Sequence, residues 1–478
     1  MAVKIAKATP FEGAPKILAP SVFGASVGKD FIYRIPVIGQ RPISISAEGL
    51  IEGITFENGI LRGNIKENCE FEILITAKNT LGETAKHLKI SVGFDNALRT
   101  PLMGFTSWNA FASRVTQQDI ENTADYMVKS GIADYGYDYV NTDSGWQKEY
   151  GGKYDAIMPN SKFPDMKKMC DKIHSLGFKA GIYSTPMLTA WGCPKEFESI
   201  PGCTRGEPDI LLTGCNGGVG MEHMEENNVR QWEEWGMDYL KYDWALTDPY
   251  TADFMKRALL NSSRDISFCV TVLADFNYAA YWKKNCCSWR DGMDAVNRWD
   301  VLLKLFGTVD KWKDVVCQGH FYDLDMLEIG QVDSSETGDP NELHLKRGFS
   351  DYEKLFSYSM RAFFSSPLQL SCLLTKLSEF EFNLICNEEI IAINQDALAS
   401  YPEKIKDDGS VRIYRRELEN GDTAYAIFNI SENAVTEKLC LPENCVLRDL
   451  WLKENVADSG KFEHTVPPHS VKILKVIA

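Results

Sequence analysis

Residues 222–243, EHMEENNVRQWEEWGMDYLKYD, contain the pattern that decides the fold. Their apolar side chains recur at helical spacing and predict a helix over Glu222–Trp235, which Gly236 ends. A short strand, DYLKYD, follows at once and finishes in charged side chains. Residues 116–143 and 165–184 repeat this helix–glycine–strand unit, which indicates a chain built from βα units.

The βα units extend over residues 96–396. Eight short apolar strands are predicted to alternate there with helices, at 102–108, 137–143, 179–184, 238–243, 267–273, 288–294, 316–327 and 368–374. A parallel (β/α)8 TIM barrel is the expected closure. A doubly wound open sheet would show a similar pattern, so that alternative stays open.

Two all-β regions flank the barrel. Residues 1–95 contain β-branched runs such as FEILITAKN, separated by glycine and asparagine turns that include Glu57-Asn58-Gly59. Residues 397–478 return to the short strands VRIYRREL, TAYAIFNI and HSVKILKVI. We therefore expect a multidomain protein with a β domain at 1–95, a catalytic barrel at 96–396 and a C-terminal antiparallel β-sandwich at 397–478.

Composition excludes several classes of protein. The 478 residues include 51 Lys and Arg against 67 Asp and Glu, a net charge of −16, which argues against a nucleic-acid partner. The longest apolar stretch, Phe363–Leu377, is interrupted by polar residues, so no membrane span is expected. No signal-peptide core opens the chain, which predicts a cytoplasmic protein on the sequence as given, or a periplasmic or secreted one if a signal preceded Met1.

The cysteines do not form a recognisable framework. They number 13, an odd count, and a disulfide scaffold is not expected in a chain of this size. Cys193, Cys203 and Cys215, with the pair Cys286-Cys287, could suggest a metal set, but the spacing of a zinc site is absent. We expect neither a metal nor a cofactor.

The predicted strand ends are unusually polar, and the active site of a TIM barrel lies at the carboxyl ends of its strands. The residues expected there are Trp108, Asp143, Tyr183, Lys241, Asp243, Trp289, Arg290, Asp294, Asp323 and Asp325. One Asp after a strand is commonly a helix cap, but a whole rim of carboxylates and cations is not explained in that way. No Ser–His or Cys–His pair accompanies them, and carboxylates beside a Trp face are typical of a sugar site.

Seven ordered motifs over roughly residues 101–398 then carry a specific resemblance. They are TPLMGFTSWNAF, YVNTDSGW, GFKAGIYS, WGMDYLKYD, CSWRDGMD, YDLDMLEIG and EIIAINQDAL. In these motifs the chain resembles glycoside hydrolase family 27, whose members are retaining α-galactosidases (melibiases) and α-N-acetylgalactosaminidases. The resemblance implies an exo-acting enzyme that removes terminal α-linked galactose from an oligosaccharide or glycoconjugate by double displacement.

The resemblance also implies roles for single residues. The Asp of the Lys-aromatic-Asp strand, here Asp243, is the nucleophile, and the Asp four residues after the Arg of Trp-Arg, here Asp294, is the acid/base. The substrate-binding positions that it implies are Trp108, Asp143, Tyr183, Lys241, Thr271, Arg290 and Asp325. Physically, Lys241 and Arg290 would keep Asp243 ionised, whereas partial burial and a neighbouring carboxylate would keep Asp294 protonated.

Several positions depart from the family pattern. Most members have two consecutive Asp residues where this chain has Asp143-Ser144, and the usual Cys two positions after the nucleophile is Ala245. The stretch 191–220 is longer than usual and is expected to reshape the entrance. Thr271 and Ala274 occupy the two positions that read the sugar's 2-substituent. They form a small–small pattern that predicts at least secondary activity on α-N-acetylgalactosaminides, if the register there does not slip by one.

The N-terminal region has a resemblance of its own. Its Gly-Ile-Thr-Phe…Asn-Gly-Ile-Leu-Arg-Gly turn, followed by an alternating strand, resembles a bacterial immunoglobulin-like module. We expect a structural spacer in preference to a glycan-binding domain, so that deleting residues 1–95 would leave small-substrate chemistry largely unchanged.

Other interpretations remain. A carbohydrate-binding pseudoenzyme would have no need of both Asp243 and Asp294. Ser144, in place of the family's second Asp, leaves open an enzyme of the same family that cleaves α-glucosidic or β-L-arabinopyranosidic bonds. Asp323-Leu324-Asp325 could be the DxD motif of a nucleotide-sugar transferase, but the family places it at strand seven, where it supports the nucleophile. Glu222, His223 and His320 are expected to be loop and rim residues and not metal ligands.

Overall fold

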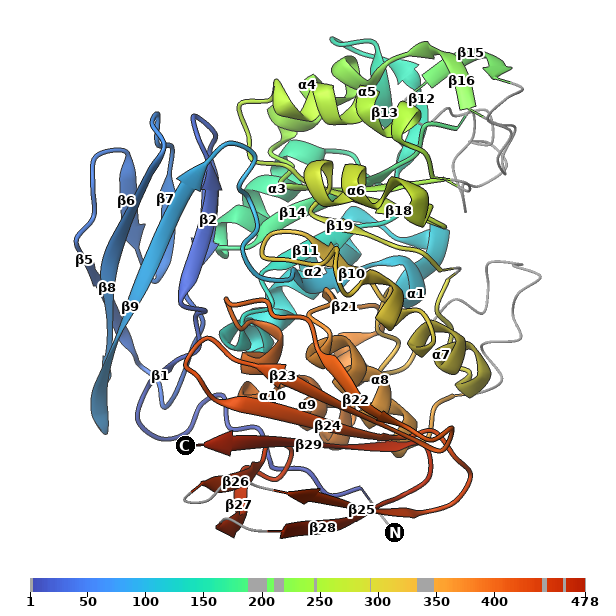
Figure 1. Ribbon diagram of the computed structural model, residues 1–478. Coiled ribbons are helices and arrows are strands. Elements are labelled where there is room, and N and C mark those ends of the chain that lie inside the picture. Colours follow the sequence, from blue (N-terminus) through green and yellow to red (C-terminus); the bar gives the residue numbers. More distant parts are fainter. Residues whose placement is uncertain are drawn as a thin grey trace.

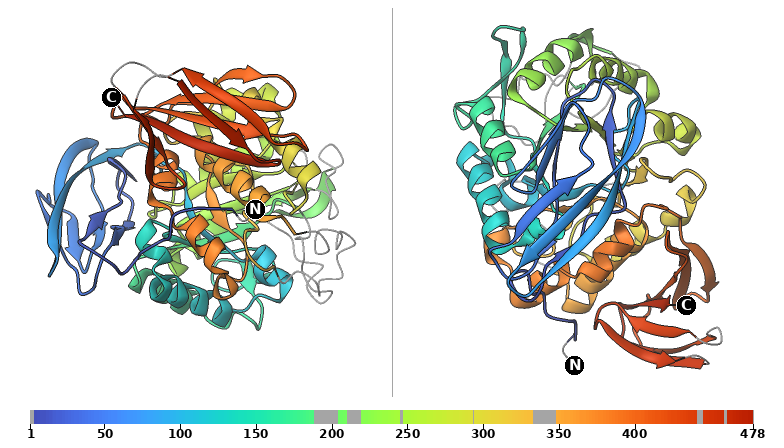
Figure 2. Two further views of the ribbon diagram at one scale, coloured as in Figure 1. Left: turned by 90° about the horizontal axis from the view of Figure 1, so that it is seen from below. Right: turned by 90° about the vertical axis from the view of Figure 1, so that its left-hand side faces the viewer.

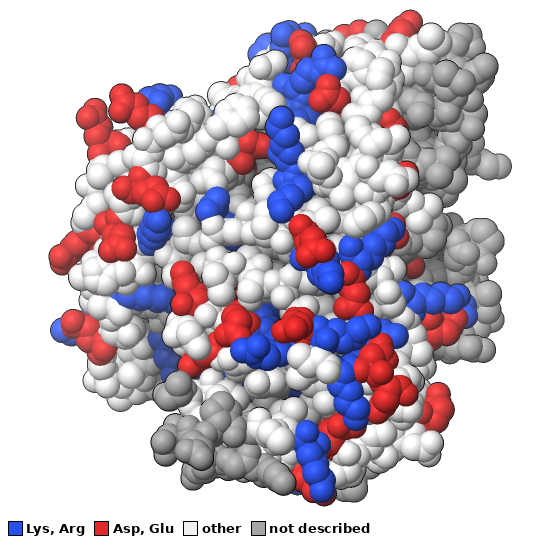
Figure 3. Space-filling model, in the orientation of Figure 1, with Lys and Arg blue, Asp and Glu red and all other residues white. Residues whose placement is uncertain are grey.

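The computed structural model describes residues 3–187, 204–209, 219–244, 247–292, 294–332, 348–440, 445–458 and 461–477 (Figure 1). An N-terminal all-β region lies on one side of a central α/β body, and a C-terminal β region lies below that body in this view. Among these residues, no helix is long and apolar enough to cross a membrane. On the face drawn in Figure 3, acidic and basic side chains lie interspersed.

The centre is an eight-stranded parallel sheet whose strands follow one another in sequence order, with β21 next to β10. The strands are β10 (Met103–Thr106), β11 (Tyr139–Thr142), β14 (Lys179–Ser184), β17 (Tyr239–Asp243), β18 (Ser267–Thr271), β19 (Ser288–Trp289), β20 (Phe321–Tyr322) and β21 (Leu368–Leu370). Leu327, which follows β20, closes the ring by bridging to Leu370. This closure confirms the barrel and excludes the doubly wound alternative, whose strand order reverses at a switch point.

The barrel helices begin and end as the local chemistry dictates. Thr116 and Asp119 form a capping box at the start of α2, and Gly131 ends that helix in the left-handed region at φ 86°. The α-helices among the described residues are α1 (Trp108–Phe111), α2 (Gln117–Ser130), α3 (Met166–Ser175), α4 (Glu225–Trp235), α5 (Pro249–Leu260), α6 (Ala279–Asn285), α7 (Trp299–Phe306), α8 (Asp351–Phe363), α9 (Glu379–Ile385) and α10 (Glu388–Asn394).

The predicted start of the helix at Glu222 is wrong by three residues. Val219–His223 forms strand β16, which pairs with β15 (Thr204–Asp209) in an antiparallel hairpin, so α4 begins only at Glu225. A second hairpin, β12 (Gln147–Gly151) with β13 (Ala156–Pro159), follows β11. Both are insertions between a barrel strand and the next helix.

The N-terminal region consists of two sheets around a core of its own. Strands β2 (Val22–Ser26), β9 (Gly82–Gly93), β8 (Cys69–Asn79) and β5 (Ser44–Glu48) form one sheet, and β3 (Phe31–Arg34), β7 (Ile60–Gly63) and β6 (Ile54–Glu57) form the other. The short strands β1 (Lys16–Ile17) and β4 (Val37–Ile38) pair beside them. Asn58 and Gly59, both at positive φ, make the two-residue turn between β6 and β7 at the predicted place.

This region covers the barrel at the amino ends of its strands, as the right-hand view of Figure 2 shows. Arg62 Nη2 donates to the carbonyl of His174 at 2.7 Å, and Arg34 Nη1 donates to the carbonyl of Leu176 at 3.0 Å, both at the end of α3. Lys179, at the start of β14, places its ammonium over the ring of Tyr33 at 5.5 Å. The N-terminal region is therefore docked at the end of the barrel opposite to the strand ends that were predicted to carry the site.

The C-terminal region is a β-sandwich, as predicted. One sheet runs β22 (Glu403–Asp407), β23 (Val411–Glu417), β24 (Thr423–Asn429), β29 (Ser470–Ile477), β26 (Val446–Asp449) and β27 (Glu454–Asp458), and β25 (Val435–Cys440) pairs with β28 (Lys461–Val466). Phe428 packs against Phe306 and Phe356 of the barrel helices, with ring centroids 4.8 and 4.9 Å apart. The sandwich thus packs directly on the barrel through a shared aromatic core.

Candidate active site

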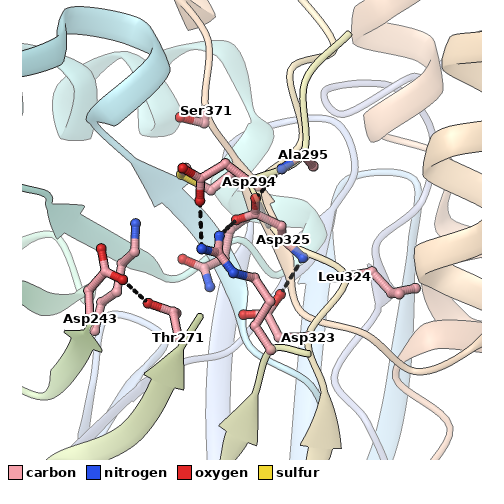
Figure 4. A network of polar contacts seen from close by, with 12 residues as sticks. Asp243, Thr271, Asp294, Ala295, Asp323, Leu324, Asp325 and Ser371 are labelled. Atoms are coloured by element: carbon pink, nitrogen blue, oxygen red, sulfur yellow. Dashed lines mark hydrogen bonds and ion pairs between the residues drawn. The ribbon is translucent and has the colours of Figure 1, made fainter. Parts of the chain in front are cut away.

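The polar side chains predicted at the strand ends form three connected groups at the carboxyl end of the barrel. Figure 4 shows two of these groups, with Asp243 and Thr271 on one side and Asp294 above Asp325 on the other. They come from β17, β18 and the segments that follow β19 and β20. The predicted strand over 288–294 ends already at Trp289, and the side chain of the next residue, Arg290, binds Asp294 and Asp325 in this site.

The first group joins β11 and β17. Lys241 Nζ donates to Oδ2 of Asp143 at 2.8 Å, and the ammonium lies 5.6 Å from the centre of the Tyr183 ring. Asp143 also accepts from the hydroxyl of Thr106 at 3.3 Å. Although burial lowers the pKa of Lys241, the charges of Asp143 and Asp243 outweigh it and raise that pKa. The group therefore presents a permanently charged ammonium to the barrel mouth.

The second group is the pair Asp243 and Thr271, which lie opposite each other on β17 and β18. Thr271 Oγ1 donates to Oδ1 of Asp243 at 2.6 Å. Burial raises the pKa of Asp243, and Lys241 and Arg290 oppose this without cancelling it. The two cations favour the ionised carboxylate, as their positions in the sequence predict, but burial sets the net direction of the shift in its pKa.

The third group surrounds the buried Arg290. Its Nη1 binds Oδ1 of Asp325 at 2.5 Å and its Nη2 binds Oδ1 of Asp294 at 2.6 Å. Burial lowers the pKa of Arg290, but these two carboxylates and Asp243 raise it well above its usual value. Burial likewise raises the pKa of Asp325, and Arg290 with Lys241 lowers it on balance. A fixed guanidinium thus holds two carboxylates from neighbouring strand ends.

The expected partial burial of Asp294 is not observed. Its side chain is 67% exposed, against 3% for Asp325 on the same guanidinium. Asp294 lies beyond the end of β19, and its side chain is open to solvent. A carboxylate this open can reach a leaving group that projects from the barrel mouth.

The position predicted to read the 2-substituent also differs from expectation. Ala274 is fully buried and donates its amide to the carbonyl of Arg290 at 2.9 Å, whereas Leu273, with φ 57°, is 36% exposed. Of the two predicted positions, Ala274 is thus buried, and the backbone before it turns through the left-handed region at Leu273. Activity on α-N-acetylgalactosaminides stays a prediction.

Trp108 begins α1 shortly after β10 and is half-buried. Asp323 directly follows β20 and contacts the third group through Asp325. Asp323 Oδ1 accepts the amide of Asp325 at 2.8 Å. Burial and the charge of Asp325 raise the pKa of Asp323 to about 6. Ala245, and residues 191–203 and 210–218 of the insertion at 191–220, lie outside the described residues.

Sequence reasoning missed a clamp that holds the Asp294 segment. Asp325 Oδ2 accepts the amide of Ala295 at 2.6 Å, and Glu328 Oε2 accepts the amide of Asn297 at 3.1 Å. Asn297 Nδ2 returns a hydrogen bond to the carbonyl of Glu328 at 2.9 Å. The sequence signal was present in YDLDMLEIG, where Asp325 and Glu328 stand three residues apart.

This clamp leads to a prediction about stability and pH. Burial raises the pKa of Glu328 to about 8 from an ordinary 4.5, with Asp325 and Asp294 adding to the shift. The pKa of Glu328 is higher in the folded protein than its ordinary value in the unfolded chain. The contribution of Glu328 to the free energy of unfolding is therefore fully present below about pH 4.5 and is lost as pH rises through 8. Glu328→Gln keeps the acceptor without the charge, and should raise the free energy of unfolding at neutral pH by on the order of 2 kcal/mol.

Thermal unfolding of Glu328→Gln and the wild type from pH 4.5 to 8.5 checks this. The gap in Tm between them should widen steadily toward high pH. The same change at the exposed Glu403 is the control and should leave the gap flat. A Glu328→Gln gap that is constant with pH would show that the carboxyl ionises normally.

The described residues contain no group of three or more His, Cys, Asp and Glu that could hold a metal ion. His320 Nδ1 lies 2.8 Å from the carbonyl of Cys286, and His223 stacks on Phe254 with ring centroids 3.6 Å apart. His223, predicted in a loop or at the rim, instead ends strand β16, and His320 lies directly before β20.

Comparison with known proteins agrees with this geometry. The family model described as "Alpha galactosidase A" matches residues 100–204 and 207–396, and the model of the α-galactosidase C-terminal β-sandwich domain matches 408–476. An α-galactosidase of Oryza sativa subsp. japonica is 28% identical over 396 residues, covering 80% of this chain and 85% of the relative. α-Galactosidase A of Cellvibrio japonicus is 29% identical over 418 residues, covering 80% and 93%.

Similarity to solved structures extends over the whole chain, and one example shows its extent. It is the crystal structure of a candidate α-galactosidase/melibiase from Bacteroides fragilis, with a TM-score of 0.87 and 27% identity, covering 98% of this chain and 99% of that one. Because coverage is nearly complete on both sides, the N-terminal region is included in the similarity together with the barrel and the sandwich.

Proposed function

Because this chain belongs to glycoside hydrolase family 27, the α-galactosidase (melibiase) family, we propose that it is a retaining, exo-acting α-galactosidase. Its substrates are oligosaccharides or glycoconjugates that end in α-linked galactose. One observation carries the proposal: a buried carboxylate, Asp243, and an exposed one, Asp294, both interact with the charge of Arg290 at the carboxyl end of the barrel. A retaining glycosidase needs two such carboxyl groups in unlike surroundings.

In this mechanism Asp243 attacks the anomeric carbon while Asp294 protonates the departing oxygen. The bond from the sugar to the aglycone breaks as the bond to Asp243 forms, and Asp294 is left ionised. Asp294 then takes a proton from water, whose oxygen displaces Asp243 from the sugar. Both steps occur with inversion, so the sugar leaves in the α-configuration in which it arrived.

The remaining rim residues bind the sugar in this proposal. Lys241 and Asp143 offer a donor and acceptors to ring hydroxyls, and Tyr183 and Trp108 offer aromatic surface. Arg290 and Asp325 act with them. The Arg290 guanidinium orients Asp294, and the Asp325 carboxylate holds that guanidinium in place. The role of Thr271 is argued separately below.

The N-terminal region is, in our proposal, an immunoglobulin-like domain at 1–95, followed by the barrel at 96–396 and the sandwich at 397–478. Two facing sheets with a core of their own support this assignment for the N-terminal region. Its contacts to the end of α3 and the start of β14 support a structural role away from the substrate.

Proton NMR of the first product tests the mechanism. During rapid hydrolysis of a nitrophenyl α-galactoside, the α-anomer of galactose should appear first and the β-anomer only as mutarotation proceeds. An initial β-anomer would mean a single displacement and would overturn the double-displacement proposal.

A further inference from the structure

Thr271 stands in an unusual relation to the proposed nucleophile. β17 and β18 are paired in register, with Asp243 directly opposite Thr271, and both side chains are nine-tenths or more buried. The 2.6 Å hydrogen bond from Thr271 Oγ1 is the one that the Asp243 carboxylate accepts from the described residues. It engages Oδ1 and leaves Oδ2 toward the barrel mouth without such a bond (Figure 4).

The backbone around Thr271 keeps this hydroxyl where it is. The carbonyl of Thr271 accepts the amide of Trp244 at 3.1 Å and the hydroxyl of Thr247 at 2.9 Å. Three residues on, the amide of Ala274 donates to the carbonyl of Arg290. A β-branched side chain on a backbone held from both sides has little rotamer freedom, so its hydroxyl has a fixed direction.

We propose that Thr271 is a positioning residue for the nucleophile and does not read the sugar's 2-substituent. By binding Oδ1, its hydroxyl fixes the plane of the Asp243 carboxylate so that Oδ2 points at the anomeric carbon. The inference rests on the proposed function, because it needs Asp243 to be the attacking group. It deepens that proposal by giving a residue expected among the substrate contacts a different task.

The same hydrogen bond favours the ionised carboxylate. Burial and the charge of Asp294 raise the pKa of Asp243, while Lys241 on the same strand, Arg290 beyond β19 and the Thr271 hydroxyl lower it. Removing the hydroxyl takes away one of the three groups that stabilise the charge. The acidic limb of the kcat/KM profile should then move to higher pH.

The test compares Thr271→Val, Thr271→Ser and the wild type on the nitrophenyl glycoside that the wild type cleaves best. Thr271→Val keeps the shape and loses the hydroxyl, so kcat should fall by roughly 10- to 100-fold with KM changed less than threefold. Its acidic limb should shift upward. Thr271→Ser restores the hydroxyl and should recover most of the loss in kcat together with the wild-type limb.

Thr142→Val is the matched control. Thr142 is equally buried at the end of β11, and its hydroxyl has no hydrogen-bond partner among the described residues. The same substitution there should leave kcat and the pH profile unchanged. If Thr142→Val and Thr271→Val lose activity alike, the loss comes from packing and the inference is wrong.

The two proposals can fail separately. If Asp243→Asn is inactive but Thr271→Val keeps its kcat and pH profile, Asp243 remains the nucleophile and the positioning role of Thr271 is wrong. If instead Thr271→Val changes the ratio of kcat/KM between an α-galactoside and its 2-deoxy analogue, Thr271 reads the 2-position and the inference is overturned. If Asp243→Asn keeps its turnover, both proposals are wrong together.

Discussion

Asp243→Asn should lower kcat on the order of 10⁴-fold or more while leaving the fold intact. Asparagine has the shape of aspartate and can still accept the hydrogen bond from Thr271, but its amide cannot attack the anomeric carbon. The measurement is kcat on a nitrophenyl α-galactoside, with the far-UV circular dichroism and Tm of the variant recorded beside it. Near-normal turnover would show that the nucleophile has been placed on the wrong strand.

The exposed Asp275, on the loop after β18, provides the matched control, because the same Asp→Asn change there touches neither Lys241 nor Arg290. A stronger form of the experiment removes the side chain altogether. In Asp243→Gly, added azide should enter the vacated space and give the β-galactosyl azide, since one displacement then replaces two. Rescue without azide incorporation would point to a different nucleophile.

The second large effect is expected from Asp294→Ala, and it should depend on the leaving group. A natural α-galactoside leaves as a poor alkoxide and needs the proton, so kcat/KM on it should fall about 10³-fold. A dinitrophenyl galactoside leaves without protonation, so its first step should be nearly unaffected. The glycosyl-enzyme then accumulates, because the base for the second step is also gone, and a burst of phenolate should appear.

Asp291→Ala is the control for that experiment. Asp291 directly follows Arg290, but its carboxylate binds Lys311 at 2.6 Å and Trp312 Nε1 at 3.1 Å, and no contact to the Arg290 guanidinium is found among the described residues. Its loss should affect both substrates equally and modestly. Equal losses on both substrates for Asp294→Ala would remove it from the role of acid/base.

The barrel was predictable because its signals are local. Capping residues such as Thr116, the glycines that end α2 and α4 and the apolar runs of the strands all act within about twenty residues of chain. Helix α4 shows where local signals are insufficient. The residues before Glu225 have helical propensity, but in the structure they pair with β15 as a strand. Local propensity gives way there to a tertiary contact.

The site was predictable in its residues and less so in its contacts. The polar strand ends identified Asp243, Arg290 and Asp325, but the pairing of Thr271 with Asp243 depends on how β17 and β18 are aligned across the sheet. The exposure of Asp294 depends on where its segment leaves the barrel. Both the pairing of Thr271 with Asp243 and the exposure of Asp294 depend on how separate strands assemble, so they are seen only in the folded barrel.

The docking of the N-terminal region at the far end of the barrel has a thermodynamic consequence. Arg62 and Arg34 bind carbonyl groups at the end of α3, and these are arranged to receive them only when the barrel is folded. A sugar bound at the carboxyl end stabilises the folded barrel by mass action. The two ends are therefore linked through the folding equilibrium, and a bound galactoside opposes any unfolding of the N-terminal region that accompanies unfolding of the barrel.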